Sequence, residues 1–252
     1  QKMKNEILIK DKGVNGLVSA ADEKSEEFLL AEITKKYPDH YILSEEDYEN
    51  SKSKSFTPAQ EAEYAWVIDP LDGTNNFING IPIYAVSICL MYEGAPLIGT
   101  VYNPLSGECF FASKNGGASL IDFRINPLKC YSLNIQANTK KMNECIFSPA
   151  PVYDQGSRFE QQLSTFKKNI TGARAVRRLG SAALELCYVA SGNFDAYWEQ
   201  DLKPWDVAAA CLICEEAGIK VTDYNGQSFN PFKDSVIAAQ SHLHKRIISK
   251  IS

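Results

Sequence analysis

The hydrophobic pattern in the first half of the chain predicts a sheet. Residues 64–68 form an apolar run rich in β-branched and aromatic residues, which indicates a buried strand. Three later apolar runs, at residues 85–92, 96–102 and 108–113, are separated by short breaks that contain Gly, Asn or Pro. Their spacing predicts an antiparallel meander.

Polar and apolar positions before this sheet predict a helix and a short strand. Ser19 and Asp22 form a pattern that resembles a capping box, so a helix is expected to begin there and to end before Pro38. Its apolar face is expected to carry Phe28, Leu29 and Ile33. Residues 41–43 predict a short strand, and the polar composition of residues 48–63 predicts a surface loop.

The second half alternates strand and helix patterns, which is typical of an α/β layer. The expected order is a strand at 145–147, a helix at 158–168, a strand at 173–179, a helix at 181–190 and a strand at 193–198. Residues 126–141 are expected to connect the halves. We therefore expect one domain, residues 1–252, with an antiparallel-sheet lobe of about residues 1–135 and a smaller α/β lobe of about residues 136–252.

Composition and charge narrow the class of protein. The chain has 252 residues, of which 44% are hydrophobic and 23% charged, and this balance is typical of a globular domain. No run approaches the roughly 20 apolar residues that span a bilayer, and the first residues lack a signal peptide's hydrophobic stretch. We expect a cytoplasmic protein without membrane attachment, and the abrupt start of the sequence leaves open whether the N-terminus is truncated. The net charge is −5 and no basic tract is long enough to follow a nucleic-acid backbone, which argues against nucleic-acid binding.

The cysteine, histidine and arginine clusters predict no disulfide framework, redox site or metal site. Seven cysteines without regular spacing indicate reduced thiols rather than a disulfide framework. Cys211 and Cys214 form a CxxC pattern in the middle of a predicted helix, where neither a zinc site nor redox work is expected. His242 and His244 lie in a polar C-terminal segment, where a metal site is not expected. The cluster Arg174, Arg177 and Arg178 is interpreted as a solvated strand edge or a subunit contact.

Acidic residues stand where the strand at residues 64–68 ends. Asp69 and Asp72 flank the rigid Pro70, so both carboxylates, with the carbonyl of Leu71, can turn towards one cation. The small polar residues after Asp72 favour a helix start, where the backbone amides of Gly73 and Thr74 would suit an anion such as phosphate. Spacing alone leaves a helix cap or a solvated turn equally open. Carboxylates beside phosphate-binding amides are typical of metal-assisted phosphoryl transfer.

This stretch resembles the Asp-Pro-(Ile/Leu)-Asp-Gly-Thr-x-Asn-Phe signature of the inositol monophosphatase family. A second stretch, Trp205-Asp206-Val207-Ala208-Ala209-Ala210 followed by Glu216-Ala217-Gly218, is similar to that family's Trp-Asp-x-Ala-Ala-Gly and Glu-Ala-Gly-Gly motifs. The resemblance runs from about Gly16 to Ala239. It departs from the family pattern at Gly16, Ser19, Ser44, Ala210 and Ile219.

The resemblance implies roles for individual residues. The implied metal ligands are Glu45, Asp69, the Leu71 carbonyl, Asp72 and Asp206, with Glu46 as an acid supporting Glu45. The implied catalytic residues are Asp22, Thr74 and Glu45. The implied substrate contacts are Asp72, Gly73, Thr74, Ala182, Glu199 and Asp206. Without the resemblance, Asp22 is a first-turn acid, residues 44–47 are a solvated turn and Asp206 is an N-cap.

The resemblance also implies a fold and an activity. The fold would be a layered αβαβα sandwich of the sugar-phosphatase type. The activity would be lithium-sensitive hydrolysis of a small sugar or inositol monophosphate, with two to three Mg²⁺ ions and a metal-activated water, by a homodimer. Fructose-1,6-bisphosphatase, 3′-phosphoadenosine 5′-phosphate phosphatase and histidinol-phosphate hydrolysis stay open as alternatives. So does a partner-binding regulatory protein that keeps the fold, because fold alone does not determine function.

Overall fold

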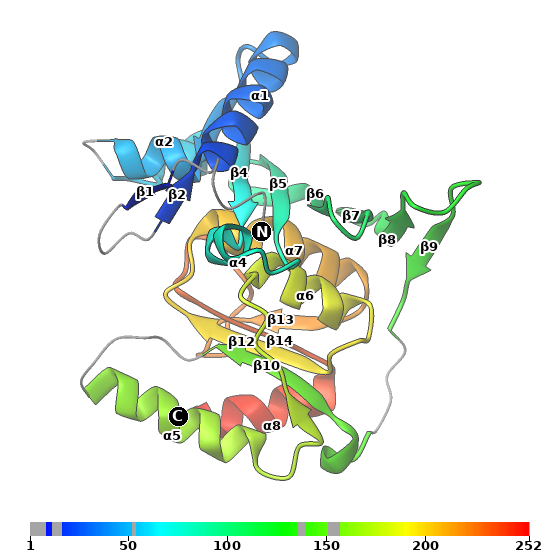
Figure 1. Ribbon diagram of the computed structural model, residues 1–252. Helices are drawn as coiled ribbons and strands as arrows, with labels where there is room; N and C mark the ends of the chain where they lie inside the picture. The colour runs from blue at the N-terminus through cyan, green and yellow to red at the C-terminus, as the bar shows by residue number, and fades with distance from the viewer. Residues whose placement is uncertain (1–8, 12–16, 52–53, 136–139, 151–156, 252) are drawn as a thin grey trace.

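The computed structural model describes residues 9–11, 17–51, 54–135, 140–150 and 157–251. Within these residues two large sheets and three layers of helices alternate, in the order helix, sheet, helix, sheet, helix (Figure 1). The expected layered sandwich is therefore confirmed. Gly16, one of the departures from the family pattern, lies outside the described residues.

The larger sheet has seven strands in sequence order. They are β3 (Tyr41–Ser44), β4 (Tyr64–Asp72), β5 (Ala85–Tyr92), β6 (Ala95–Asn103), β7 (Glu108–Ser113), β8 (Gly117–Asp122) and β9 (Cys130–Leu133). β3 pairs with β4 in parallel, and all later neighbours are antiparallel. The predicted meander is confirmed, and β8 and β9 extend it beyond the three predicted strands.

The smaller sheet mixes parallel and antiparallel pairs. Its order is β11 (Ala175–Val176), β10 (Ile146–Ala150), β12 (Ala196–Gln200), β14 (Ser235–Ala239) and β13 (Lys220–Thr222). β10 pairs in parallel with β11 and β12, whereas β14 runs antiparallel to both of its neighbours. The predicted α/β alternation therefore describes one side of this sheet and misses the antiparallel side.

Two helices, α6 (Ala182–Ala190) and α7 (Pro204–Glu216), fill the space between the sheets. α7 is buried along almost its whole length and carries a run of alanines that permits close packing. At Gly99 in β6, an added Cβ would lie only 2.7 Å from the carbonyl oxygen of Ala209. The helix backbone therefore rests directly on the sheet, because Gly99 has no side chain.

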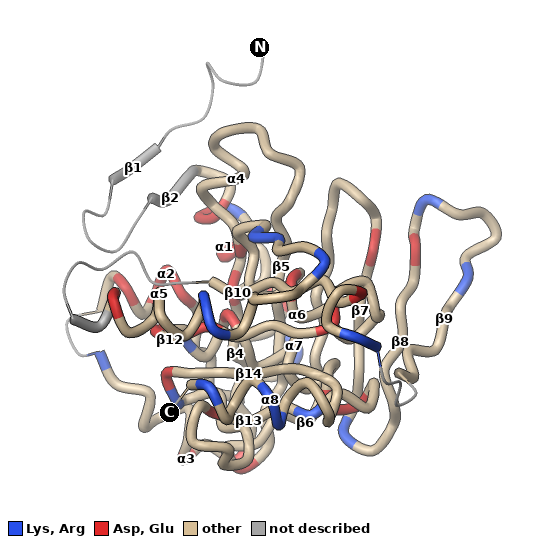
Figure 2. Tube along the Cα trace, turned by 90° about the horizontal axis from the view of Figure 1, so that it is seen from below, with Lys and Arg blue, Asp and Glu red and all other residues tan. Residues whose placement is uncertain are grey.

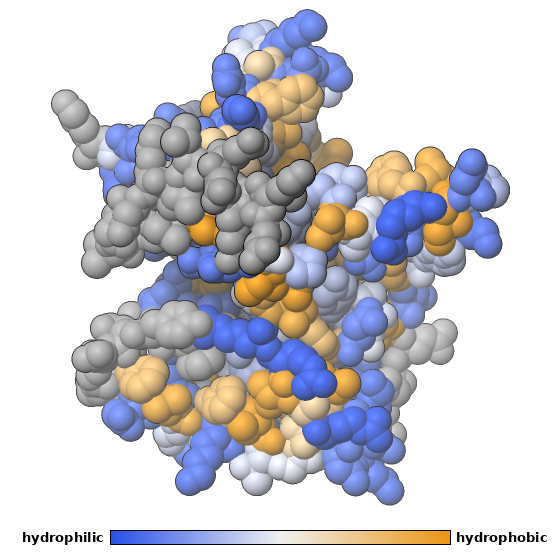
Figure 3. Space-filling view, viewed as in Figure 1, coloured by the Kyte–Doolittle hydropathy of each residue, from blue (hydrophilic) through white to orange (hydrophobic). Residues whose placement is uncertain are grey.

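The outer faces carry the remaining long helices. α1 (Ala20–Lys36) lies beside β4, while α5 (Ser157–Ile170) and α8 (Ser241–Ile251) cover the smaller sheet. A second apolar cluster joins that sheet to α8; it includes Phe147, Trp198, Ile237, Leu243 and Ile247. Some apolar atoms remain visible along α5 and α8 in the space-filling view (Figure 3).

Shorter elements complete the chain. They are β1 (Ile9–Asp11), β2 (Leu17–Ser19), α2 (Glu45–Asn50), α3 (Thr57–Glu61), α4 (Thr74–Asn79) and the 3₁₀ turn η3 (Met142–Glu144). No helix among the described residues is long and apolar enough to cross a membrane. Lys and Arg are spread over several elements and are interspersed with acidic residues (Figure 2).

Several expectations about these elements are wrong in detail. Residues 48–63 are not only loop, since they contain the end of α2 and all of α3. The connection expected at 126–141 contains β9, which pairs with β8. The strand expected at 173–179 is reduced to Ala175–Val176. Phe28 is 65% exposed, so it does not belong to the buried face of α1.

Candidate active site

Asp69 and Asp72 lie at the end of β4, where the strand contains a bulge. Asp69 pairs with Ser87 and Asp72 with Ala85, so three steps along β4 match two steps along β5. In a regular strand, residues three apart point to opposite faces, and the extra residue of a bulge cancels this alternation. The bulge therefore lets both buried carboxylates turn to the same side.

Gly73 ends the strand and begins α4. Its backbone has φ +96°, and an added Cβ would lie 3.0 Å from the Ile83 carbonyl oxygen and 3.2 Å from that of Gly180. A residue with a side chain would be strained here on both counts. The glycine predicted at this helix start is thus required by the geometry of the turn.

The parallel pairing of β3 and β4 brings a second acidic segment to the same edge. Ser44, the last residue of β3, pairs with Ile68, so Glu45 follows β3 beside Asp69. The solvated turn considered for residues 44–47 is wrong, because Glu45 opens α2 and Glu46 is only 3% exposed.

Asp69 is the most strongly perturbed of these acids. Its side chain is 2% exposed, and one oxygen accepts the Leu71 N–H over 2.9 Å. Burial raises the pKa of Asp69 well above its usual range, and the negative charges of Glu45, Asp72 and Asp206 raise it further. The four acids from distant parts of the chain therefore act on one another.

Asp72 is held by the start of α6. Its Oδ2 accepts the Ser181 hydroxyl over 2.6 Å and the Ala183 N–H over 2.8 Å. Burial raises the pKa of Asp72 to about 6, against these hydrogen bonds, which lower it.

Asp206 stands in the first turn of α7. Its Oδ2 accepts the backbone N–H of Lys203 over 2.7 Å, so Asp206 caps the helix from its third position. The reading as an N-cap residue is therefore wrong, since Lys203 occupies that position. Burial, and to a smaller degree the charge of Asp72, raises the pKa of Asp206 to about 7.

Asp22 and Thr74 meet through their side chains. The Thr74 hydroxyl lies 2.8 Å from Oδ1 of Asp22, which is 1% exposed, and 3.1 Å from the Leu71 carbonyl oxygen. α1 is also tied to β4 by the Ser25 hydroxyl, which donates to the Pro70 carbonyl over 2.8 Å. The first-turn acid of α1 is thus carried into the site by tertiary packing.

A cavity of about 330 Å³ opens beside these residues. Its lining includes Asp72, Ala182, Glu199 and Asp206, whereas Asp69, Glu45, Thr74 and Asp22 are not among the described residues that line it. Burial raises the pKa of Glu199 to about 8, while its hydrogen bond from Tyr197 lowers it. Of the arginine cluster, Arg178 also lines this cavity, 4.0 Å from Glu199, and this place was not expected.

The chain matches the model of the inositol monophosphatase family over residues 1–252. The chain belongs to the inositol monophosphatase family. A protein named Nus factor SuhB, from Pasteurella multocida, is 35% identical over 95% of this chain and 84% of its own length. An inositol-1-monophosphatase from Mesorhizobium japonicum is 34% identical over 95% of this chain and 84% of its own length.

Solved structures of the family share this fold. The extragenic suppressor protein suhB of Bartonella henselae superposes with a TM-score of 0.83 and 29% identity, covering 100% of this chain and 90% of its own. Family membership makes this protein a phosphoric monoester hydrolase.

In this inositol monophosphatase family member, the described acidic side chains are not arranged as a complete set of metal ligands. Among the described residues, no three His, Cys, Asp or Glu side chains lie in an arrangement that could hold a metal ion as they stand. Asp69, Asp72 and Asp206 each direct one oxygen to a protein donor.

Three further residues contact this site and were not singled out from the sequence as functional. Asn76 and Glu185 hydrogen-bond the loop before α6, and Ser181 binds Asp72 directly. Asn76 stands at the asparagine of the family signature, and the glycine and hydroxyl at residues 180–181 indicate a helix start, but neither signal names a partner. Asn76 and Ser181 contact residues more than 100 positions away in the chain. Glu185 contacts a nearby loop, but the conformation of that loop depends on tertiary packing.

Proposed function

We propose that this chain is a magnesium-dependent phosphomonoesterase that releases inorganic phosphate from a small sugar or inositol monophosphate. The observation that carries the proposal is the group of four carboxylates at the ends of β3 and β4 and the start of α7, in which buried Asp69 is repelled by the charges of the other three. Such a group is costly without cations, and cations would relieve the repulsion. Oxygen donors are the ligands that Mg²⁺ prefers.

The chemistry of the donor set, carboxylate and carbonyl oxygens, suits two ions. Glu45, Asp69 and the Leu71 carbonyl would hold one, and Asp69, Asp72 and Asp206 the other, with a third and weaker ion on Glu45 through water. The hydrogen bonds described above reach one carboxylate oxygen of each aspartate, and the other oxygen would face the cation. Bound Mg²⁺ would supply Lewis acidity that activates a water molecule and neutralises charge on the phosphate.

The protein's own residues would place and deprotonate the attacking water. The Thr74 hydroxyl donates its proton towards Asp22, so its oxygen is left to accept a proton from a water molecule. Asp22 then receives the proton that Thr74 passes on. Glu46 would support Glu45 from its buried side.

The substrate would lie in the cavity beside these groups. The backbone amides of Gly73 and Thr74 would donate to the phosphate, while Glu199 and the backbone of Ala182 would contact hydroxyl groups of the sugar or polyol. A volume of about 330 Å³ is at the small end of the roughly 300–1,000 Å³ of ligand pockets, which favours a monophosphate over the larger nucleotide substrate.

A phosphate-release assay tests the proposal. Inositol 1-phosphate, fructose 1,6-bisphosphate, 3′-phosphoadenosine 5′-phosphate and histidinol phosphate would each be offered with Mg²⁺ and with a chelator. We expect Mg²⁺-dependent release that is fastest from inositol 1-phosphate and is inhibited by millimolar Li⁺. Release that is unchanged by the chelator would contradict the metal-dependent mechanism. Faster release from one of the other substrates would correct the substrate class.

A second candidate function is partner-binding regulation, which the name of the Pasteurella multocida relative, Nus factor SuhB, favours. A complementation experiment in cells distinguishes the two functions. An Asp69→Asn variant that restores the phenotype of a strain lacking this protein would show that the role does not need catalysis. Failure of that variant to restore the phenotype, when the wild type does so, would favour the phosphatase.

A further inference from the structure

The donors that hold Asp72 come from one short loop. The Ser181 hydroxyl and the Ala183 N–H both reach Oδ2 of Asp72, and Ser181 is also the N-cap of α6, where its oxygen accepts the Leu184 N–H. The Ser181 hydroxyl has a single proton, which goes to Asp72. The path of residues 179–181 therefore decides whether both donors point at the carboxylate.

The carbonyl groups of this loop are held by Asn76 in α4. Its side-chain amide lies 2.7 Å from the Leu179 carbonyl oxygen and 3.3 Å from that of Gly180. The same amide group donates to the Ile83 carbonyl over 2.7 Å. Asn76 is 8% exposed, so its side-chain amide makes these contacts from a largely buried position.

The N–H groups of the same two residues are held by Glu185. One oxygen, Oε1, accepts both the Leu179 N–H and the Gly180 N–H, the latter over 3.0 Å. Glu185 is 2% exposed and belongs to the first turn of α6, from which it reaches back to the loop before the helix. Two buried side chains therefore bind both N–H groups and the Leu179 carbonyl, while the Gly180 carbonyl makes only a longer contact that shares a proton of the Asn76 amide.

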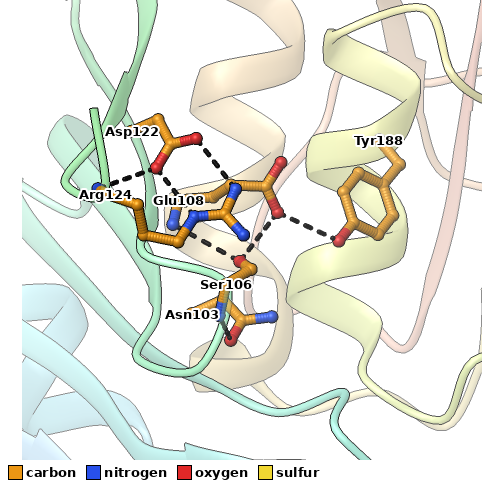
Figure 4. Close-up of polar contacts among 6 residues, drawn as sticks. All are labelled: Asn103, Ser106, Glu108, Asp122, Arg124 and Tyr188. Atoms are coloured by element: carbon orange, nitrogen blue, oxygen red, sulfur yellow. Dashed lines mark hydrogen bonds and ion pairs between the residues drawn. The ribbon is translucent and has the colours of Figure 1, made fainter.

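The loop lies close against the Asn76 side chain. Gly180 has φ +81°, and an added Cβ would lie 3.1 Å from the Asn76 amide nitrogen. The far end of α6 is anchored separately, because the Tyr188 hydroxyl donates to Glu108, the first residue of β7, over 3.4 Å (Figure 4). The near end depends on Asn76 and Glu185.

We propose that Asn76 and Glu185 are positioning residues: they hold residues 179–181 so that Ser181 and Ala183 orient Asp72, and they thereby set the affinity of the site for Mg²⁺. The statement about Mg²⁺ affinity rests on the proposed function. When the loop relaxes, Asp72 loses the two donors that orient Oδ2, and its other oxygen no longer faces the cation. Loss of such outer contacts costs about 10- to 100-fold in metal affinity or activity.

Three substitutions at Glu185 separate geometry from charge. Glu185→Gln keeps an acceptor oxygen at the same reach and loses the charge, whereas Glu185→Asp keeps the charge and loses the reach. Glu185→Ala loses both. If the loop is held by geometry, Gln behaves like the wild type, and Asp and Ala raise the Mg²⁺ concentration for half-maximal activity about 10- to 100-fold.

Glu216→Ala is the matched control. Glu216 also accepts two backbone N–H groups of one turn, those of Asn115 at 2.9 Å and Gly117 at 3.0 Å, away from the acidic site. Its loss also removes two hydrogen bonds to a turn, so we expect the melting temperature to fall in both alanine variants. Only Glu185→Ala is expected to change the Mg²⁺ requirement. Equal Mg²⁺ requirements in the two variants, or a Gln variant as impaired as Ala, would overturn the proposal.

Amide hydrogen exchange of the metal-free protein separates this inference from the proposed function. We expect peptides covering residues 179–184 to exchange faster in Glu185→Asp and Asn76→Ser than in the wild type, and at the wild-type rate in Glu185→Gln. Unchanged exchange in the Asp and Ser variants would overturn the positioning role. A wild-type protein that releases no phosphate, with the expected exchange pattern, would overturn the proposed function and leave the positioning role standing.

Discussion

The Thr74 hydroxyl lies 2.8 Å from the carboxylate of Asp22, although 52 positions separate the two residues in the chain. Thr74 opens α4 directly after the bulged end of β4, and Asp22 lies in the first turn of α1. The contact joins the helix that covers the outside of the larger sheet to the turn that carries the acidic site. A proton can pass along this contact without movement of either element.

The Thr74–Asp22 contact predicts a catalytic defect with little loss of stability. Thr74→Val keeps the shape and removes the hydroxyl, so we expect turnover at saturating Mg²⁺ to fall about 100- to 10,000-fold, which is the usual contribution of general acid–base catalysis. Thr74→Ser retains the hydroxyl and is the control. Steady-state phosphate release measures both. Turnover within threefold of the wild type in the Val variant would exclude the relay.

Asp69→Asn is expected to abolish activity and to stabilise the metal-free protein. The carboxylate is buried among like charges, so removing its charge removes repulsion, and the melting temperature without metal rises. The same variant should lose most of the stabilisation that Mg²⁺ gives the wild type. Thermal melts with a chelator test the rise in melting temperature, and melts with Mg²⁺ test the loss of stabilisation by the metal. Asp122→Asn, which changes a carboxylate paired with exposed Arg124, is the control.

His244 predicts a loss of stability in mild acid. The side chain is 1% exposed, its Nε2 lies 2.7 Å from the Thr222 hydroxyl, and its Nδ1 has no hydrogen-bond partner within the described structure. Burial lowers the pKa of His244 to about 4, from an ordinary value near 6.5. The unfolded chain therefore binds a proton between these pH values and the folded chain does not, so the unfolding free energy falls as pH drops from about 6.5 to 4.

His244→Leu should flatten that part of the pH dependence. The Thr222 hydroxyl still donates to the Asp223 carbonyl in this variant, so no donor is stranded. Urea unfolding at pH 5 and pH 7.5 would measure the difference for both proteins. A difference between the two pH values as large in the Leu variant as in the wild type would assign the acid sensitivity to other groups.

Gly99→Ala tests the contact between the sheet and α7. The added methyl group would lie 2.7 Å from the Ala209 carbonyl oxygen, so the helix must move away, at a cost of about 1–3 kcal/mol in unfolding free energy. Because α7 carries Asp206, activity should fall as well. Gly80→Ala meets no atom within 4 Å and carries only the left-handed backbone penalty of about 1–2 kcal/mol. Its activity should stay unchanged.

Local sequence patterns predict this fold best where neighbouring residues in the chain determine the structure of a segment. The run at residues 64–68 is buried in β4, and the three meander strands lie within two residues of their predicted bounds. The sequence pattern fails where contacts with distant segments determine the structure. β9 is four residues long and mostly exposed, so nothing local marks it, and it exists because β8 pairs with it. Phe28 follows the helical period and is nevertheless exposed.

The candidate site divides in the same way. The sequence by itself determined that this chain carries acids at a strand end, a glycine at a sharp turn and a hydroxyl at a helix start, because turn geometry and capping are properties of neighbouring residues. Only the tertiary structure decided that Glu45, Asp69, Asp72 and Asp206 act on one another, and that Ser181 reaches Asp72. The reason is physical: side-chain hydrogen bonds and charge repulsion depend on distance in space, and the bulge in β4 and the packing of α6 and α7 set those distances.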